Sequence, residues 1–154
     1  MSKFFYKDKP IVGLDISSTG IKLMSVDPKK WLVHGYGSVD LDPTRMREGL
    51  ESEKSTFLAD SLKELIENNI IGSLLSKRVA IAVPTSRTYT RTFTLPSSAE
   101  KSLDEAVMLE VEQYIPIPLE TLYIDYQIIE RSRKTIVVLM SAVSKAVVDN
   151  ITRN

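Results

Sequence analysis

The segment from Asp15 to Lys22 has the residue types of a phosphate-binding turn. An acid precedes a run of small residues and a lysine follows it; the run is Ser17, Ser18, Thr19 and Gly20. Successive backbone N–H groups in such a turn can form a concave anion site, and the glycine is free to adopt a positive φ. Lys22 would face a phosphate, and Asp15 would hold the water shell of a Mg²⁺ ion. An ordinary hairpin turn is the alternative, because the segment lacks the P-loop signature and no helix is expected after it.

The composition excludes several other kinds of chemistry. The 154 residues contain no cysteine and one histidine, His34, which excludes thiol nucleophiles, cysteine-ligated metals and a histidine relay. The 20 basic and 20 acidic side chains leave no net charge, which argues against a nucleic-acid binder. The longest apolar stretch, 136–140, is far shorter than the roughly 20 residues that span a bilayer. We therefore expect a cytoplasmic protein without nucleic acid, without direct membrane insertion and without enzyme activity of its own.

The elements that must position the turn are predicted from hydrophobic periodicity and turn residues. Three consecutive strands, at 11–16, 21–26 and 31–41, are separated by short turns and predict an antiparallel meander. A polar connection at 42–54 and a helix at about 56–69 follow. The short apolar segment 79–83 predicts a strand that is buried on both faces and reached by a parallel crossover.

The sequence pattern changes after Pro84. Residues 87–95 alternate arginine, aromatic and leucine side chains with threonines, which predicts a half-exposed strand. A capping box at 97–100 predicts a helix to about residue 115, where two prolines end it. We expect Tyr114 to be largely buried on the apolar side of this helix. Two strands and a final helix are predicted after it, at 122–130, at 135–143 and from residue 144.

Charge is unevenly distributed along this neutral chain. Residues 77–91 contain four basic side chains and no acid, whereas residues 100–130 contain eight acids and one lysine. Most of the acids fall on the helix predicted at 97–115 and on the loop after it. They form either a solvated helix face or a docking surface for a basic partner.

Two motifs resemble the family of actin-like ATPases that contains FtsA and PilM. One is the hairpin 13–26. The other is the run Leu-Glu-Val-Glu-Gln-Tyr-Ile-Pro-Ile-Pro-Leu-Glu at 109–120, followed by Ile-Asp-Tyr at 124–126, which is typical of the PilM branch. The resemblance implies an α/β chain with a partial actin-like, ribonuclease H-like fold. Residues 1–84 would begin subdomain 1A with a mixed sheet, residues 85–143 would form the inserted α+β subdomain 1C, and residues 144–154 would return into 1A, where the chain is cut short.

The resemblance also implies a function and a partner. PilM relatives are cytoplasmic scaffolds of type IV pilus assembly that hold the N-terminal tail of the inner-membrane protein PilN, in a groove between 1A and 1C. This chain would then be peripheral to the inner membrane through that partner. The partner-binding side chains would be Arg87, Arg91, Glu110 and Tyr114. The alternatives are an FtsA-like cell-division protein, in which self-association is expected, and an unrelated degenerate domain.

Longer relatives in this family bind ATP and Mg²⁺. The resemblance therefore also implies that the hairpin residues belong to a nucleotide site. The nucleotide would contact Asp15, Ser17, Ser18, Thr19, Gly20 and Lys22, with Asp15 reaching the metal through water. Actin-like hairpins usually have a glycine where this chain has Ser17. The second phosphate loop of the family lies beyond residue 154, so we expect this chain to bind no nucleotide by itself. The nucleotide-binding half of an actin-like ATPase is the alternative function.

Overall fold

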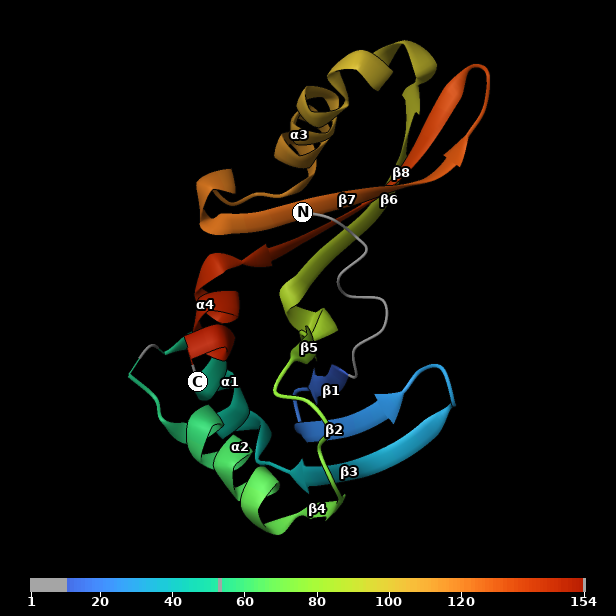
Figure 1. The fold of residues 1–154 in the computed structure, drawn as a ribbon. Coiled ribbons are helices and arrows are strands. Elements are labelled where there is room, and N and C mark those ends of the chain that lie inside the picture. Colours follow the sequence, from blue (N-terminus) through green and yellow to red (C-terminus); the bar gives the residue numbers. More distant parts are fainter. Residues whose placement is uncertain (1–10, 53, 154) are drawn as a thin grey trace. The chain divides into compact units, whose positions relative to one another are not determined.

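The chain forms two compact units in the computed structural model, which describes residues 11–52 and 54–153 (Figure 1). Unit 1 contains the described residues up to Pro84 and those from Asn150 onward, and unit 2 is the single stretch Thr85–Asp149. Both units combine a sheet with helices, so the expected mixed α/β fold class is confirmed. The assignment of the units to subdomains 1A and 1C stays a prediction.

Unit 1 is built on a five-stranded mixed sheet with the order β4-β3-β2-β1-β5. Its strands are β1 (Ile11–Ile16), β2 (Gly20–Asp27), β3 (Leu32–Asp40), β4 (Ile70–Gly72) and β5 (Val79–Ala82). The first four pair antiparallel in series, and β5 runs parallel to β1. The predicted meander and the parallel crossover are therefore both confirmed.

The two faces of this sheet have opposite characters because side chains alternate along each strand. Leu14 lies opposite Leu23, and Ile16 lies opposite Ile21, and all four are buried. The helices α1 (Pro43–Glu51) and α2 (Phe57–Asn68) lie on one side of the sheet (Figure 1). They contribute further buried residues, which are Met46, Leu50, Leu58 and Leu65. At the end of the chain, the buried Asn150 amide donates to the Leu50 carbonyl at 3.0 Å.

Two predictions for unit 1 are wrong in detail, and one strand was missed. The supposed polar connection contains α1, which begins where the Asp42 carboxylate accepts from two backbone N–H groups and Pro43 takes the first helical position. Strand β4 was not predicted, because its three residues directly follow α2. Strand β5 is exposed at all four positions and is not buried on both faces, since it pairs only with β1 among the described strands.

Gly20 permits a close approach between two strands. A Cβ atom at this position would lie 2.3 Å from the Val39 carbonyl oxygen, well inside contact distance. Gly20 does not use its freedom to adopt a positive φ, since Gly72 is the one described glycine with that conformation. The close packing of the β2 and β3 backbones thus requires glycine at position 20.

We expect Gly20→Ala to lower the free energy of unfolding by about 1–3 kcal/mol, because the β2–β3 backbone must move apart. The matched control is Gly13→Ala, where a Cβ would lie an ordinary 3.8 Å from the Met24 carbonyl oxygen. Urea unfolding followed by far-ultraviolet circular dichroism compares the two variants. Equal stability of the two would contradict this account of Gly20.

Unit 2 consists of a three-stranded antiparallel sheet with one helix packed on it. The strands are β6 (Thr88–Pro96), β7 (Leu122–Arg131) and β8 (Thr135–Ser144), in the order β6-β8-β7. The helix α3 (Leu103–Tyr114) buries Val107 and Val111 against this sheet. Beneath it, β8 contributes Ile136, Val138 and Met140, which are at most 1% exposed. The helix α4 (Lys145–Arg153) follows β8.

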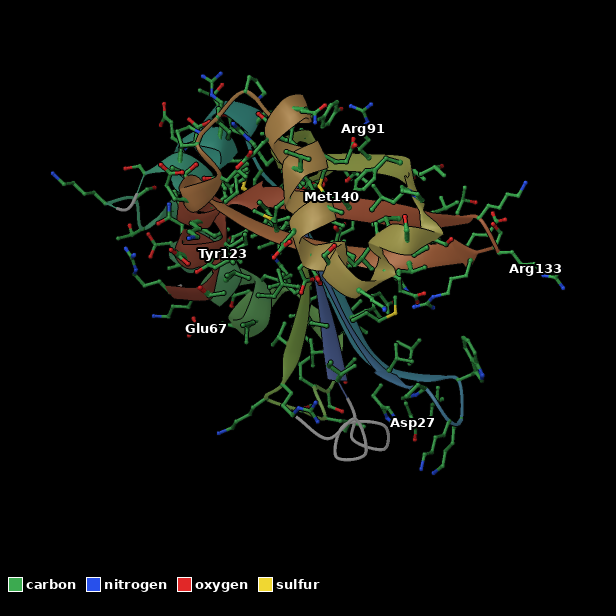
Figure 2. The ribbon with its side chains drawn as sticks, turned by 90° about the horizontal axis from the view of Figure 1, so that it is seen from above. Asp27, Glu67, Arg91, Tyr123, Arg133 and Met140 are labelled. Atoms are coloured by element: carbon green, nitrogen blue, oxygen red, sulfur yellow. The ribbon has the colours of Figure 1, made fainter. Side chains whose placement is uncertain are left out.

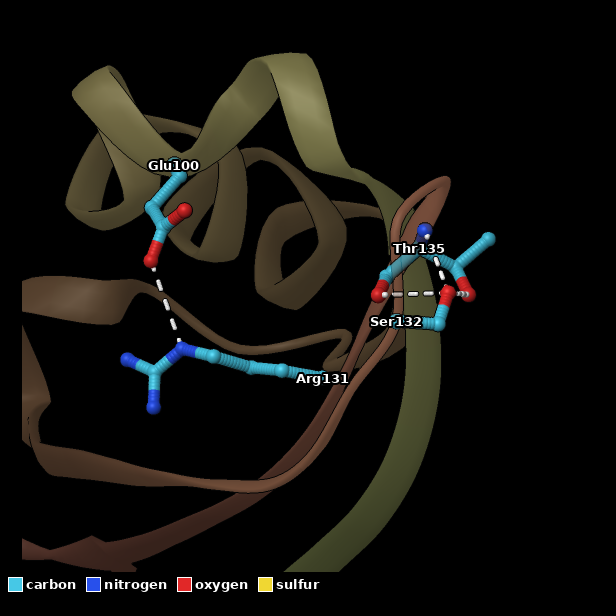
Figure 3. Close-up of polar contacts among 4 residues, drawn as sticks. All are labelled: Glu100, Arg131, Ser132 and Thr135. Carbon is cyan, nitrogen blue, oxygen red and sulfur yellow. Dashed lines mark hydrogen bonds and ion pairs between the residues drawn. The ribbon is translucent and has the colours of Figure 1, made fainter.

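The helix predicted from a capping box begins six residues later than expected. Residues Ser97–Ser102 form a 3₁₀ helix, and α3 starts at Leu103 without a side-chain cap. The Ser97 hydroxyl does not cap the helix, because it donates to the Arg133 carbonyl at 3.1 Å. The Arg131 guanidinium also bonds Glu100 at 3.3 Å, which attaches this region to β7, while Ser132 bonds Thr135 within the turn between β7 and β8 (Figure 3).

Candidate functional sites

The predicted phosphate-binding turn joins β1 to β2 at one end of the unit 1 sheet. Asp15 lies directly opposite Lys22 in the antiparallel register, and both side chains point to the exposed face. They also line a cavity of about 460 Å³ on that face. The rest of its lining is mostly apolar or small and comes from four strands, including Gly13, Met24, Tyr36, Ser38 and Ala82. The register thus brings together one acid and one base beside an open surface.

The turn itself uses part of its own hydrogen-bonding capacity. The Ser17 N–H and hydroxyl both donate to the Gly20 carbonyl at 3.0 Å, and the Thr19 N–H donates to the Ser17 hydroxyl oxygen at 3.4 Å. Ser18 and Thr19 are exposed, whereas Gly20 is buried. Lys22 and the exposed hydroxyls have the chemistry to contact a phosphate, and Asp15 has the chemistry to bind a hydrated Mg²⁺ ion. No group of three metal-ligating side chains lies together among the described residues.

The predicted partner-binding residues all belong to unit 2, and the structure joins two of them directly. The Arg91 guanidinium carbon lies 4.4 Å from the centre of the Tyr114 ring, which is a cation–π contact between β6 and the last residue of α3. Figure 2 shows Arg91 beside α3. Both side chains are exposed, and Tyr114 is 42% exposed. The contact therefore holds two large side chains in place on the surface.

The expected burial of Tyr114 is wrong, and the helix geometry gives the reason. Residues four apart lie on one side of a helix, and the buried series here is Val107, Val111 and Ile115. Ile115 closes this series at 3% exposure. Tyr114 is one residue earlier and projects to the side, where it meets Arg91.

The other two predicted partner-binding residues are Glu110 and Arg87. Glu110 lies one helical turn before Tyr114 and is half-buried. Arg87 ends the 3₁₀ helix Thr85–Arg87, just before β6, and is half-buried. Glu110 is thus one helical turn from Tyr114, and Arg87 lies four residues before Arg91 in the chain.

Two tyrosine–aspartate hydrogen bonds were not predicted from the sequence. The Tyr126 hydroxyl donates to Asp104 at the start of α3, and this bond raises the pKa of Tyr126. The Tyr123 hydroxyl donates to Asp149 at 3.0 Å, which raises the pKa of Tyr123. The alternation of β7 placed Tyr126 and Ile124 on the helix side, but no sequence pattern indicates which acid each hydroxyl meets. These acids are therefore partly engaged within unit 2.

Comparison with solved structures defines the class of protein. The chain aligns with a structure of a PilM-PilN type IV pilus biogenesis complex at TM-score 0.74 and 23% identity, over 92% of this chain and 42% of that one. It also aligns with the cytoplasmic domain of EpsL, an inner membrane component of the type II secretion system of Vibrio cholerae (TM-score 0.53, 14% identity, 94% and 53% covered). A Bacteroides thetaiotaomicron protein of unknown function with an actin-like ATPase fold aligns at TM-score 0.50 (15% identity, 99% and 51% covered). The fold is therefore that of part of an actin-like protein, since the chain covers about half of the matched chains.

The family follows from the sequence itself. Residues 13–153 match the family described as type IV pilus assembly protein PilM, and this chain belongs to that family. It spans about two fifths of the length of the solved PilM chain. Within the described residues, no helix has the length and apolar character to cross a membrane.

Proposed function

We propose that this chain serves type IV pilus assembly as a scaffold that binds the N-terminal cytoplasmic tail of a PilN-like inner-membrane protein. Family membership and the likeness to a PilM-PilN complex support a pilus role. The exposed Arg91–Tyr114 contact supports these two residues as the place where the tail binds. In this role the chain is peripheral to the inner membrane, and its partner supplies the membrane anchor.

The Arg91–Tyr114 pair has the properties of an interface anchor. Arginine and tyrosine are among the residues most enriched where a few side chains dominate a binding energy. Because each holds the other in position, less side-chain freedom is lost when a peptide binds over them. Glu110 adds a negative charge one turn away, and Asp104, Glu105 and Glu112 add further acids along α3. These acids favour encounter with a basic tail.

A fluorescence-polarisation titration tests the proposal. The ligand is a labelled peptide that copies the first residues of the PilN-like protein encoded beside this chain, and the control is the same peptide in scrambled order. We expect saturable binding of the native peptide and none of the scrambled one. Equal binding of both peptides, or binding of neither, would remove the scaffold function from this chain.

Nucleotide binding in longer relatives is the second candidate, and unit 1 would contribute to such a site the cavity beside Asp15 and Lys22. The described residues supply one acid, one lysine and a largely apolar wall. We therefore expect no saturable heat when Mg-ATP is titrated up to millimolar concentration in isothermal calorimetry. Saturation in the micromolar range that is lost in Asp15→Ala would instead establish a complete nucleotide site in this chain.

A further inference from the structure

The end of the β2–β3 hairpin exposes the largest apolar side chain of the protein. Trp31 is 88% exposed, and the two residues after it, Leu32 and Val33, are 50% and 47% exposed. The hairpin end projects from its sheet, away from α1 and α2 (Figure 1). Trp31 therefore lies at the hairpin end, and Leu32 and Val33, the first residues of β3, add apolar surface on the two faces of the strand beside it.

The backbone of this tip is held in a form that is unfavourable for tryptophan. Trp31 has φ of 52°, and it is the one described residue other than glycine with a positive φ. A bulky residue is rare in this region, where glycine or asparagine is favoured. The Asp27 carboxylate fixes the turn by accepting from the Lys29 and Lys30 N–H groups at 2.9 and 3.2 Å. These same bonds lower the pKa of Asp27. A well-ordered turn thus presents an indole to solvent at a conformational cost.

Basic side chains adjoin the apolar ones on this tip. Lys29 and Lys30 immediately precede Trp31, and both are exposed. The single acid of the turn, Asp27, faces the two backbone N–H groups that it accepts. A tip with an indole, two aliphatic side chains and two ammonium groups combines the two terms that attract a protein to an anionic lipid surface.

We propose that the β2–β3 hairpin tip touches an anionic membrane surface, with Trp31 in the headgroup region and Lys30 against lipid phosphate. Tryptophan favours this region because its ring is apolar and its N–H still finds a partner there. One such contact is weak, so it acts as a second attachment for a protein that another contact already holds at the membrane. The inference stands on the hairpin alone and does not depend on tail binding.

The chain carries its own reporter for this contact, because Trp31 is its only tryptophan. Vesicles of mixed phosphatidylglycerol and phosphatidylcholine are titrated into the 154-residue protein while tryptophan emission is recorded. We expect a shift of emission to shorter wavelength that saturates with lipid, and a much smaller shift with phosphatidylcholine alone. Lys30→Ala should weaken the apparent lipid affinity about fivefold, which is the contribution expected of one lysine near an anionic surface. The matched control is Lys63→Ala on α2, whose exposed ammonium forms a 4.0 Å pair with Glu67 and which should leave the affinity unchanged.

Vesicle flotation provides a second readout that does not need the indole. Trp31→Gly should reduce the bound fraction about tenfold or more. It should leave the thermal unfolding temperature unchanged or higher, because glycine relieves the positive φ. An unshifted emission spectrum with anionic vesicles would overturn the proposal and would leave Trp31 as a contact for a protein partner. The same would follow if Trp31→Gly floated as well as the unaltered chain.

Discussion

Replacing Met140 by alanine is expected to lower the free energy of unfolding of unit 2 by about 2–5 kcal/mol. Met140 is fully buried in β8, the central strand, and in the register of the sheet it lies between Arg91 of β6 and Tyr126 of β7. Figure 2 places it in the sheet beneath α3. Its removal leaves a cavity that two neighbouring strands and a helix close only in part.

The exposed Met24 on β2 supplies the matched control. It is 47% exposed, so Met24→Ala removes the same atoms with little loss of burial and should change stability by less than about 0.5 kcal/mol. Hydrogen exchange measured by mass spectrometry resolves the two units, and faster exchange should be confined to β6, β7, β8 and α3 in Met140→Ala. Similar exchange in both variants would contradict the packing described for unit 2.

Tyr114→Ala is expected to weaken binding of the PilN-like tail about 30-fold or more, the effect of losing an interface residue worth about 2 kcal/mol. Its effect on folding should be small, about 1 kcal/mol, because the ring is 42% exposed and loses mainly the Arg91 contact. Fluorescence polarisation measures the first quantity and urea unfolding the second. The separation of the two effects distinguishes a binding residue from a core residue.

Tyr36→Ala is the control for this prediction, because Tyr36 is 49% exposed and belongs to unit 1. It should bind the tail as tightly as the unaltered chain. Arg91→Ala should resemble Tyr114→Ala, since each residue positions the other. A loss of several kcal/mol of stability in Tyr114→Ala, with unchanged tail affinity, would make Tyr114 a structural residue and contradict the proposed surface.

Strong local patterns predicted most of the strands, and tertiary contacts explain the exceptions. The strand predicted at 11–16 matches β1 to the residue, and β6, β7 and β8 differ from prediction by a residue or two at their ends. Helix α1 was missed because its mean character is polar, although the Asp42 N-cap followed by Pro43 at the first helical position was a usable start signal. The capping box failed because Ser97 bonds a carbonyl 36 residues away, which no local pattern records.

The sequence predicted which residue types make up the candidate sites. It predicted much less of how those residues are arranged in space. The hairpin pattern placed Asp15 and Lys22 on adjacent strands, and the register sets them opposite each other. The charge pattern singled out Arg91 and the acidic helix. The apolar periodicity of the helix gave Tyr114 the wrong environment, because a difference of one residue on a helix turns a side chain by about 100°. The internal bonds of Ser17 were also outside the reach of sequence patterns.

The division of the chain also has a consequence for the order in which it folds. Unit 1 is assembled from two separate stretches, and Asn150 joins them through its bond to the Leu50 carbonyl, 100 residues away. Contacts between distant residues form slowly because closing a long loop costs entropy. Unit 2 is one stretch, so all of its contacts form within residues 85–149 and no longer loop has to close. We therefore expect unit 2 to reach its native form first, so that the residues synthesised earliest belong to the unit that is completed last.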